Sequence, residues 1–380
     1  MLGREGMKLL HICSYYVGNK LYKNMVENLA TKNIDQTVYI PVRSKAHLGK
    51  NKLPESVRTV DYKYRNILNK FDRFFFKRKI NKQKKDIEKN VINKNPPEVI
   101  HAHTVFSDGG TAYLLNKKYG IKYILNVRNT DINYYYKYAI HLRPFMYKIL
   151  LNAESIVFIS HAYKRRMHSL LPSHISKKIE QKLHVIPNGI DEYWHKNAEA
   201  KDYSIQSKKI NLLFIGSINK NKNLYATILA CKRLMEEGYD VTLHVIGNGP
   251  KLEDAEKLCA DLSIQDNVIF YGYIDDKKRL LSIYRSSDIF VMPSYRETFG
   301  LVYIEAMSQG LPVIYSRNQG IDGYFIDGEV GYSIDPNDFK SIVIAVEKIV
   351  RKYDVISYNC YLESKKFNWK EISSFYSNIY

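Results

Sequence analysis

The run Ile210-Asn-Leu-Leu-Phe-Ile215 lies near the middle of the 380-residue chain, and Met7-Lys-Leu-Leu-His-Ile12 lies near its start. Both runs are short and mostly apolar, which is typical of the first strand of a buried parallel sheet. After each run, short apolar segments alternate with longer amphipathic ones, as they do in strand-helix-strand units. Because 380 residues are too many for one ordinary core, two domains are expected. The sequence therefore predicts an α/β protein with two doubly wound parallel sheets.

The expected strands are short apolar runs, each followed by a helix-like segment. In the first half they cover residues 8–13, 37–41, 99–102, 123–127, 155–159 and 184–186. In the second half they cover residues 212–215, 241–246, 268–270, 289–292 and 313–315. A charged segment without a strand, residues 191–209, is expected to link the halves. We therefore predict domains over residues 1–195 and 206–358, and a C-terminal helix over residues 359–380 that packs on the first domain.

The composition excludes several classes of protein. With 11 prolines, 19 glycines and no biased tract, the chain is neither collagen-like nor disordered. Its four cysteines form no CxxC pair, so they support neither a disulfide framework nor a zinc site and fit a reducing cytoplasm. The first apolar run is too short and too polar for a signal peptide, and no run of about 18 apolar residues predicts a membrane span.

The positive charge is confined to one half of the chain. Residues 1–200 contain 36 Lys and Arg against 16 Asp and Glu, whereas residues 201–380 contain 22 against 23. Such asymmetry predicts that the first half is drawn to a polyanion, which leaves nucleic acid, anionic lipid and an acidic polymer open. Because no helix-turn-helix, zinc-finger or RNA-recognition sequence occurs, we expect no nucleic-acid partner.

A basic, aromatic segment covers residues 62–90. Leu68, Phe71 and Phe75 are spaced to share one face of a helix, with cations on the other faces. A helix of this kind can lie in the interface of an anionic membrane. The alternative is an ordinary domain helix whose aromatic side chains belong to the core.

Two glycine loops follow expected strands of the second half. Residues 216–223 combine a glycine turn with Lys220 and Lys222 before a helix, which favours a phosphate site but is also compatible with a plain polar loop. The loop Gly247-Asn-Gly-Pro250 allows close approach to a ligand, or serves as a tight turn. Neither loop is a P-loop or a dinucleotide-binding fingerprint.

The sharpest feature is a pair of glutamates in residues 293–312, Glu297 and Glu305, with seven residues between them. Glu297 would lie in the loop after a strand, and Thr298 is expected to cap a helix that Gly310 and the proline at 312 end. The amides of residues 299–301 would then face an anion, and the carboxylates could bind vicinal hydroxyls. The alternative is that both glutamates only complement the helix dipole.

With these motifs in view, the chain resembles the family-4 glycosyltransferases, also called glycosyl transferases group 1. The likeness is strongest over residues 216–335. It extends to the segments Asn188-Gly-Ile-Asp191, Val268-Ile-Phe-Tyr-Gly-Tyr273, Ser287-Asp-Ile-Phe-Val-Met-Pro-Ser294, Gly328-Glu-Val-Gly-Tyr332 and Phe367-Asn-Trp369. The resemblance implies the GT-B fold, two facing Rossmann-like domains, with the acceptor on the first domain and a nucleotide-sugar on the second.

The resemblance also implies roles in the second domain. Glu297 would contact hydroxyls of the transferred sugar, and Glu305 would hold the ribose. Lys222 would bind the diphosphate, but Ser217 stands where the family usually has a second cation, an arginine, so we consider Lys220 as its substitute. The implied nucleotide-sugar contacts are Gly216, Ser217, Lys222, Gly247, Phe299, Gly300, Leu301 and Glu305.

In the first domain, His103 ends a buried strand in the sequence His101-Ala-His103 and resembles the family's histidine beside the transferred sugar. A structural histidine and a metal ligand are the alternatives. Gly18 lies where the family has a glycine-rich loop. Arg128 and Asp131 follow another strand and would meet the acceptor or the sugar, unless they form a plain surface loop.

As a whole the resemblance implies a retaining, metal-independent hexosyltransferase without a cofactor. We expect a nucleotide-sugar donor, UDP-sugar in preference to GDP-sugar, and a saccharide acceptor, either free or linked to polyprenyl diphosphate. Capsule, exopolysaccharide or O-antigen synthesis in a bacterium would fit, with the basic half on the cytoplasmic face of an anionic membrane. The alternatives are a GT-B nucleotide-sugar epimerase and an inactive relative, for which Ser217 would be the sign.

Overall fold

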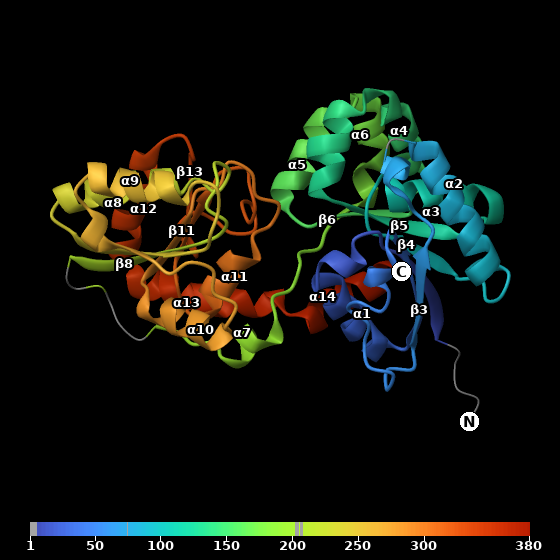
Figure 1. The fold of residues 1–380 in the computed structure, drawn as a ribbon, viewed down its shortest axis with the longest axis horizontal. Coiled ribbons are helices and arrows are strands. Elements are labelled where there is room, and N and C mark those ends of the chain that lie inside the picture. Colours follow the sequence, from blue (N-terminus) through green and yellow to red (C-terminus); the bar gives the residue numbers. More distant parts are fainter. Residues whose placement is uncertain (1–5, 74, 202–204, 206–207) are drawn as a thin grey trace. The chain divides into compact units, whose positions relative to one another are not determined.

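The computed structural model describes residues 6–73, 75–201, 205 and 208–380. The chain forms two compact units (Figure 1). The first unit contains residues up to Ile159, Tyr163–Asn188 and the last segment, Trp369–Tyr380. The second unit contains Ser160–Ala162 and Gly189–Asn368.

The first unit is built on a seven-stranded sheet in the order β3-β2-β1-β4-β5-β6-β7, and its neighbouring strands are parallel. The strands are β1 (Met7–Ile12), β2 (Ile34–Val42), β3 (Val60–Asn66), β4 (Val99–Ala102), β5 (Lys122–Val127), β6 (Ser155–Phe158) and β7 (Leu183–Val185). The helices are α1 (Leu21–Leu29), α2 (Phe76–Ile87), α3 (Ser107–Tyr119), α4 (Arg143–Asn152), α5 (His161–Leu170), α6 (Ser173–Ile179) and, from the end of the chain, α14 (Trp369–Ile379).

The second unit is built on a six-stranded sheet in the order β10-β9-β8-β11-β12-β13, again with parallel neighbours. The strands are β8 (Lys209–Ile215), β9 (Asp240–Ile246), β10 (Val268–Phe270), β11 (Ile289–Met292), β12 (Val313–Ser316) and β13 (Gly331–Ile334). The helices are α7 (Glu192–Lys196), α8 (Leu224–Glu236), α9 (Leu252–Asp261), α10 (Lys277–Ser286), α11 (Leu301–Ser308), α12 (Phe339–Val350) and α13 (Tyr353–Ser364).

The expected strands are confirmed as a set, since each expected run coincides with an observed strand. The central strands β4, β6, β11 and β12 are buried along their whole length, as continuous apolar runs in a parallel sheet require. Two observed strands were not expected. They are β3, which is a polar edge strand, and β13, which has only four residues.

The predicted basic helix over residues 62–90 is wrong in its first half. Tyr62 to Asn66 belong to β3, which pairs with β2, and the α-helix begins only at Phe76, after a short 3-10 helix at Lys70–Arg73. Leu68, Phe71 and Phe75 therefore share no helical face: Leu68 is buried, whereas Phe71 and Phe75 are 52% and 58% exposed. These residues form a strand and not a helix, because the strand's backbone pairs at the edge of the sheet while its side chains stay half exposed.

The last segment differs from the single helix predicted over residues 359–380. Residue 359 lies inside α13, which belongs to the second unit, and α14 begins at Trp369. Trp369, Ile372 and Tyr376 join the core of the first unit with Met25 and Leu29 of α1, and Figure 1 shows α14 beside α1. The division after Asn188 also differs from the predicted boundary at residue 195, because α7 packs within the second unit, against α11.

None of the helices is long and apolar enough to cross a membrane, within the ranges that the structure describes.

Candidate functional site

The candidate donor site lies where β8 and β11 of the second unit are neighbours. In this sheet order the chain leaves β8 in one direction and β11 in the other, which makes their carboxyl ends the switch point of the sheet. Ligands of doubly wound folds bind beyond this edge. The loop after β8 (residues 216–223) and the loop after β11 (residues 293–300) both start there.

An ion pair joins these two loops. The ammonium of Lys222 donates to Oε2 of Glu297, and both side chains are largely buried, at 21% and 14% exposure. Oε1 of Glu297 accepts from the amide of Thr298 at 3.0 Å, while the backbone of Glu297 is held by Gln319 and Gly320. The carboxylate therefore keeps one cation at the switch point, where it can meet an anionic ligand.

Helix α11 begins differently from the prediction. Gly300, not Thr298, is its N-cap, with φ at 84°. A Cβ at residue 300 would lie 2.5 Å from the ring of Tyr303, whose hydroxyl donates to the carbonyl of Met292. Only glycine fits this left-handed, crowded position, so the backbone turns sharply into the helix.

The residues beside this glycine have unequal access. Phe299 is buried and its ring packs on Tyr324 and Phe367, whereas Leu301, the first residue of α11, is partly exposed. The side chain of Phe299 is therefore not available to a ligand, and a contact through its backbone stays a prediction.

The two glycine loops pack directly on each other. The amide of Gly216 donates to the carbonyl of Ile246, and the amide of Ile218 donates to the carbonyl of Asn248, both at 3.0 Å. A Cβ at Gly247 would lie 2.0 Å from the carbonyl oxygen of Gly216. A glycine is needed at position 247 because the two loops are in contact there, which corresponds to the tight-turn alternative for this motif.

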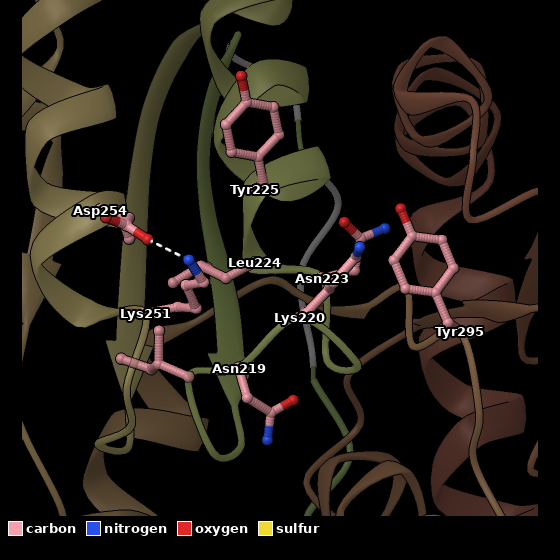
Figure 2. Close-up of a pocket in the computed structure, with 10 residues that line it drawn as sticks. Asn219, Lys220, Asn223, Leu224, Tyr225, Lys251, Asp254 and Tyr295 are labelled. Atoms are coloured by element: carbon pink, nitrogen blue, oxygen red, sulfur yellow. Dashed lines mark hydrogen bonds and ion pairs between the residues drawn. The ribbon is translucent and has the colours of Figure 1, made fainter.

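Lys220 and Lys222 have different surroundings. Lys220 lines a pocket of about 430 Å³ together with Asn223, Tyr225 and Tyr295, and Figure 2 shows the two tyrosine rings at its borders. The lining of this pocket does not include Lys222, Glu297 or Glu305. Ser217, beside them in the sequence, bonds to the side chain of Asn219 at 3.1 Å.

Glu305 lies on α11 in a more enclosed environment. Its carboxylate accepts from the hydroxyl of Tyr284 on α10 at 3.3 Å and from the indole of Trp194 on α7. Burial raises the pKa of Glu305 to about 7, and the charge of Asp191 adds to that shift. A carboxylate with two fixed donors on one side keeps its other lone pairs for hydroxyls of a ligand.

This raised pKa predicts how stability depends on pH. Between the ordinary glutamate value of 4.5 and about 7, the unfolded chain releases the proton of Glu305 while the folded protein keeps it, so stability falls as pH rises. Glu305→Gln removes this loss. We compare the free energy of unfolding of the variant with that of the wild type. The difference, variant minus wild type, is expected to be larger at pH 8 than at pH 5, by on the order of 2 kcal/mol.

Urea denaturation at the two pH values measures this difference, with Glu253→Gln on the exposed face of α9 as the control. A difference between Glu305→Gln and the wild type that is equal at pH 5 and pH 8 would show that Glu305 titrates normally.

The first unit holds a buried cluster of three histidines on β1 and at the end of β4. His11, His101 and His103 are at most 1% exposed, and burial lowers the pKa of each below its usual value, so all three are neutral. The rings of His101 and His103 stack at 4.1 Å, and Tyr22 meets His103 edge-on.

The hydrogen bonds of this cluster fix the tautomer of His103. The amide nitrogen of Gln36 donates to the carbonyl of Val26, so its oxygen accepts from Nε2 of His11. Nδ1 of His11 is then an acceptor, and Nε2 of His103 donates to it at 3.0 Å. Nδ1 of His103 is left as a buried lone pair without a partner among the described residues.

A metal is the alternative for these histidines, since one nitrogen of each lies within 4.8 Å of the others. Five of the six ring nitrogens already have partners, because His101 is bonded to Asn126 and Tyr380. Three ligands would require His11 and His101 each to give up one of these hydrogen bonds. The hydrogen-bonded network therefore fits a ligand contact by His103 better than a metal.

The other predicted residues of the first unit have separate roles. The guanidinium of Arg128 lies over the ring of Tyr22, and its positive charge helps to lower the pKa of His103. Asp131 is buried and accepts the amides of Val105 and Arg128, which ties two loops together, and burial raises its pKa to about 7. Gly18 is exposed, and a Cβ there would meet nothing within 4 Å.

Sequence reasoning missed several members of both sites. Gln36 and His11 position His103, and Tyr284 and Trp194 position Glu305. His11 could have been noticed in the sequence, because it is a polar residue inside the apolar strand β1.

Comparison with solved structures defines the class of fold. The apo form of the lipopolysaccharide outer core galactosyltransferase WaaB has a TM-score of 0.71 at 17% identity, over 98% of this chain and 99% of that one. Sucrose-phosphate synthase from Thermosynechococcus elongatus has a TM-score of 0.69 at 19% identity, over 98% of both chains. Together with the two parallel sheets, these likenesses confirm the GT-B fold.

Comparison with family models confirms the resemblance. The model for Glycosyltransferase Family 4 matches residues 19–193, and the model for Glycosyl transferases group 1 matches residues 195–359. The chain belongs to this family of glycosyltransferases.

Two curated relatives are similar over part of the chain. The capsular polysaccharide biosynthesis glycosyltransferase CapM of Staphylococcus aureus is 27% identical over 246 residues, 60% of this chain and 62% of that protein. Alpha-monoglucosyldiacylglycerol synthase of Streptococcus pneumoniae is 29% identical over 250 residues, 62% of this chain and 55% of that protein. The chain therefore matches about three fifths of the length of these relatives.

Proposed function

We propose that the chain transfers a hexose from a nucleotide-sugar, in the first place a UDP-sugar, to a saccharide acceptor with retention of the anomeric configuration. The observation that carries the proposal is the Lys222–Glu297 ion pair at the switch point of the second unit. Support comes from the family, from its members in capsule and glycolipid synthesis, and from the structure of HepE from Anabaena with UDP and glucose, whose TM-score is 0.65 at 15% identity.

In this proposal each residue at the switch point has one task. Lys222 binds the diphosphate, and the amides at the start of α11, around Gly300 and Leu301, share its negative charge. Glu297 binds hydroxyls of the sugar, and Glu305 binds the ribose. Outside this switch point, in the first unit, we propose that His103 accepts a hydrogen bond from a hydroxyl of a sugar, because its Nδ1 carries a lone pair and no proton.

The bond from the anomeric carbon to the diphosphate breaks as the bond to the acceptor oxygen forms on the same face of the sugar. The acceptor proton goes to an oxygen of the leaving phosphate. The transition state develops positive charge on the sugar and negative charge on the diphosphate. Lys222 and the dipole of α11 stabilise that negative charge, so we propose that no divalent metal is required.

The experiment is a transfer assay with UDP-glucose and a panel of saccharide acceptors in the presence of EDTA, with the anomeric configuration of the product read by NMR. The proposal expects turnover and retention. Inversion would contradict the proposed stereochemistry, and activity that returns only with Mg²⁺ would contradict metal independence. An epimerase would change the free donor without an acceptor, and an inactive relative would bind the donor without turnover.

We further propose a lipid-linked acceptor on an anionic membrane surface. The exposed Phe71 and Phe75 support this, with Lys70 over the ring of Phe71 and Arg78 exposed nearby on α2. Aromatic side chains beside cations can enter the headgroup region of an anionic bilayer. The charge of residues 1–200 adds long-range attraction.

We expect the double variant Phe71→Ser and Phe75→Ser to bind phosphatidylglycerol vesicles about 100-fold or more weakly than the wild type, since burying each phenylalanine in the bilayer contributes roughly 1.5–3 kcal/mol. Co-sedimentation measures this. The control is Ile326→Ser, which removes an apolar side chain from the second unit that is even more exposed, at 79%. Equal binding of all three proteins would exclude these phenylalanines from any membrane contact.

A further inference from the structure

The first unit contains a second polar cavity, of about 240 Å³, at the carboxyl end of its own sheet. Its polar lining comes from the loop after β1, the segment after β2, helix α2 and the first turn of α3. The polar side chains are the hydroxyls of Ser14, Tyr15, Ser107 and, from the segment after β5, Tyr135, the imidazole of His47 and the cations of Arg43 and Lys79. No carboxylate lines the cavity, within the part of the chain that the structure describes.

Lys79 is the buried cation of this cavity. It is 8% exposed, and its ammonium donates to the hydroxyl of Ser107. Among the residues described, no carboxylate forms an ion pair with Lys79. Burial lowers the pKa of this lysine, because taking an ammonium out of water is costly unless an anion compensates it.

The two carboxylates whose charges act on Lys79, Asp108 and Asp72, are hydrogen-bonded to other donors, and Asp72 is paired with Lys82. Asp108 raises the pKa of Lys79 through its charge, but its two oxygens accept from the amide and the hydroxyl of Ser14. Burial raises the pKa of Asp108 itself to about 6, and the carboxyl is still mostly ionised at pH 7. Arg43 adds a second, exposed cation at the same cavity.

The cavity also has the size and position of a ligand site. At about 30 Å³ for each water, it has room for roughly eight water molecules, which is enough for a phosphoryl group. It lies beside β1 and β4, where the order of this sheet reverses. Two cations and several hydroxyls around one space match a tetrahedral dianion better than a neutral sugar.

We propose that this cavity binds a phosphoryl group of the acceptor, with Lys79 and Arg43 as its cations. The inference rests on the proposed function, because it names the class of acceptor: a phosphorylated saccharide. A soluble sugar phosphate and a lipid-linked sugar diphosphate both carry this group, and the experiment below separates them.

The first test is calorimetric titration with inorganic pyrophosphate. The donor site would also attract this anion, so the titration uses Lys222→Met as background, in which the donor-site cation is gone. We expect binding to persist there and to weaken about 10-fold or more when Arg43→Gln is added. The control is Lys45→Gln, an exposed cation two residues away that does not line the cavity. Equal binding with and without Arg43→Gln would overturn the proposal.

Lys79→Met gives an independent readout. If Lys79 is held for an anion, removing its buried charge leaves the thermal midpoint unchanged or raises it, and abolishes the rise that pyrophosphate causes. If Lys79 only supports the fold through Ser107, the midpoint falls and the pyrophosphate effect survives, which would contradict the proposal.

The failure of this inference is distinguishable from the failure of the proposed function. UDP binding is measured on Arg43→Gln and on the wild type. If UDP binds normally but no pyrophosphate site is found, the phosphorylated acceptor is refuted and the proposed glycosyltransferase function is not. If glucose 1-phosphate displaces pyrophosphate from the cavity, the result supports a soluble acceptor. Competition by phosphatidylcholine vesicles that carry a polyprenyl diphosphate, and not by plain vesicles, supports a lipid-linked one. Competition by neither would overturn the assignment to an acceptor.

Discussion

Lys222→Met is expected to lower the rate constant of sugar transfer by about 100- to 1000-fold, the range found when one preorganised donor to a developing negative charge is removed. The loss should be greater in kcat than in the donor KM. Charge on the departing diphosphate increases as the glycosidic bond breaks, so the ammonium binds the transition state more strongly than the bound donor.

The ion pair with Glu297 strengthens this expectation. Both side chains are largely buried, and the carboxylate is anchored by the amide of Thr298 at 3.0 Å. The ammonium is therefore in position before the donor arrives, and little reorganisation is needed. Removing it also leaves the carboxylate of Glu297 without its cation, which adds a desolvation cost in the free protein.

Lys220→Met is the matched control. Its side chain lines the pocket of Figure 2, which does not include Lys222 or Glu297, and we expect kcat to change less than about threefold. A rise in the donor KM would instead give Lys220 the diphosphate contact that Ser217 does not supply. A kcat for Lys222→Met within about threefold of the wild type would remove Lys222 from the mechanism.

Gly247→Ala is expected to destabilise the second unit by about 3–5 kcal/mol, because it combines a steric clash with backbone strain. The added Cβ would lie 2.0 Å from the carbonyl oxygen of Gly216, and φ of residue 247 is 138°, where side chains are rarely found. The loop cannot move away freely, since the amide of Gly247 donates to the carbonyl of Gly272 at 2.9 Å.

Calorimetry should show a fall of roughly 10 °C in the transition of this unit. UDP binding should weaken in the same variant, because the Gly216 loop that carries Lys222 would be displaced. Gly18→Ala is the control: a Cβ there meets nothing within 4 Å, and we expect a change below about 0.5 kcal/mol. A transition for Gly247→Ala within about 2 °C of the wild type would show that the two loops are not in contact.

The extent to which the fold could be predicted follows from burial. Strands such as β4 and β11 are enclosed on both faces, so their apolar runs were visible in the sequence. Strand β3 was not visible because it is an edge strand with half-exposed side chains, and its residues were included in the basic segment that was predicted to be a helix. A local pattern cannot register backbone pairing with β2, which decides this strand.

The candidate site could also be predicted only in part. The loops after β8 and β11 were found because both follow buried strands, and the roles of Glu297 and Lys222 came from the family resemblance. That these two residues, 75 positions apart, form an ion pair could not be read from spacing. In the same way, the tautomer of His103 depends on Gln36 and His11, which only the folded sheet brings beside it.

We propose that the second unit is a nucleotide-sugar site that needs no metal. The most direct measurement is calorimetric binding of UDP, GDP, ADP and TDP in the presence of EDTA, to the wild type and to Glu305→Ala. We expect UDP to bind the wild type most tightly and Glu305→Ala to weaken this binding about 10-fold or more. Binding of none of the four nucleotides to the folded wild type, or binding that Glu305→Ala leaves unchanged, would contradict it.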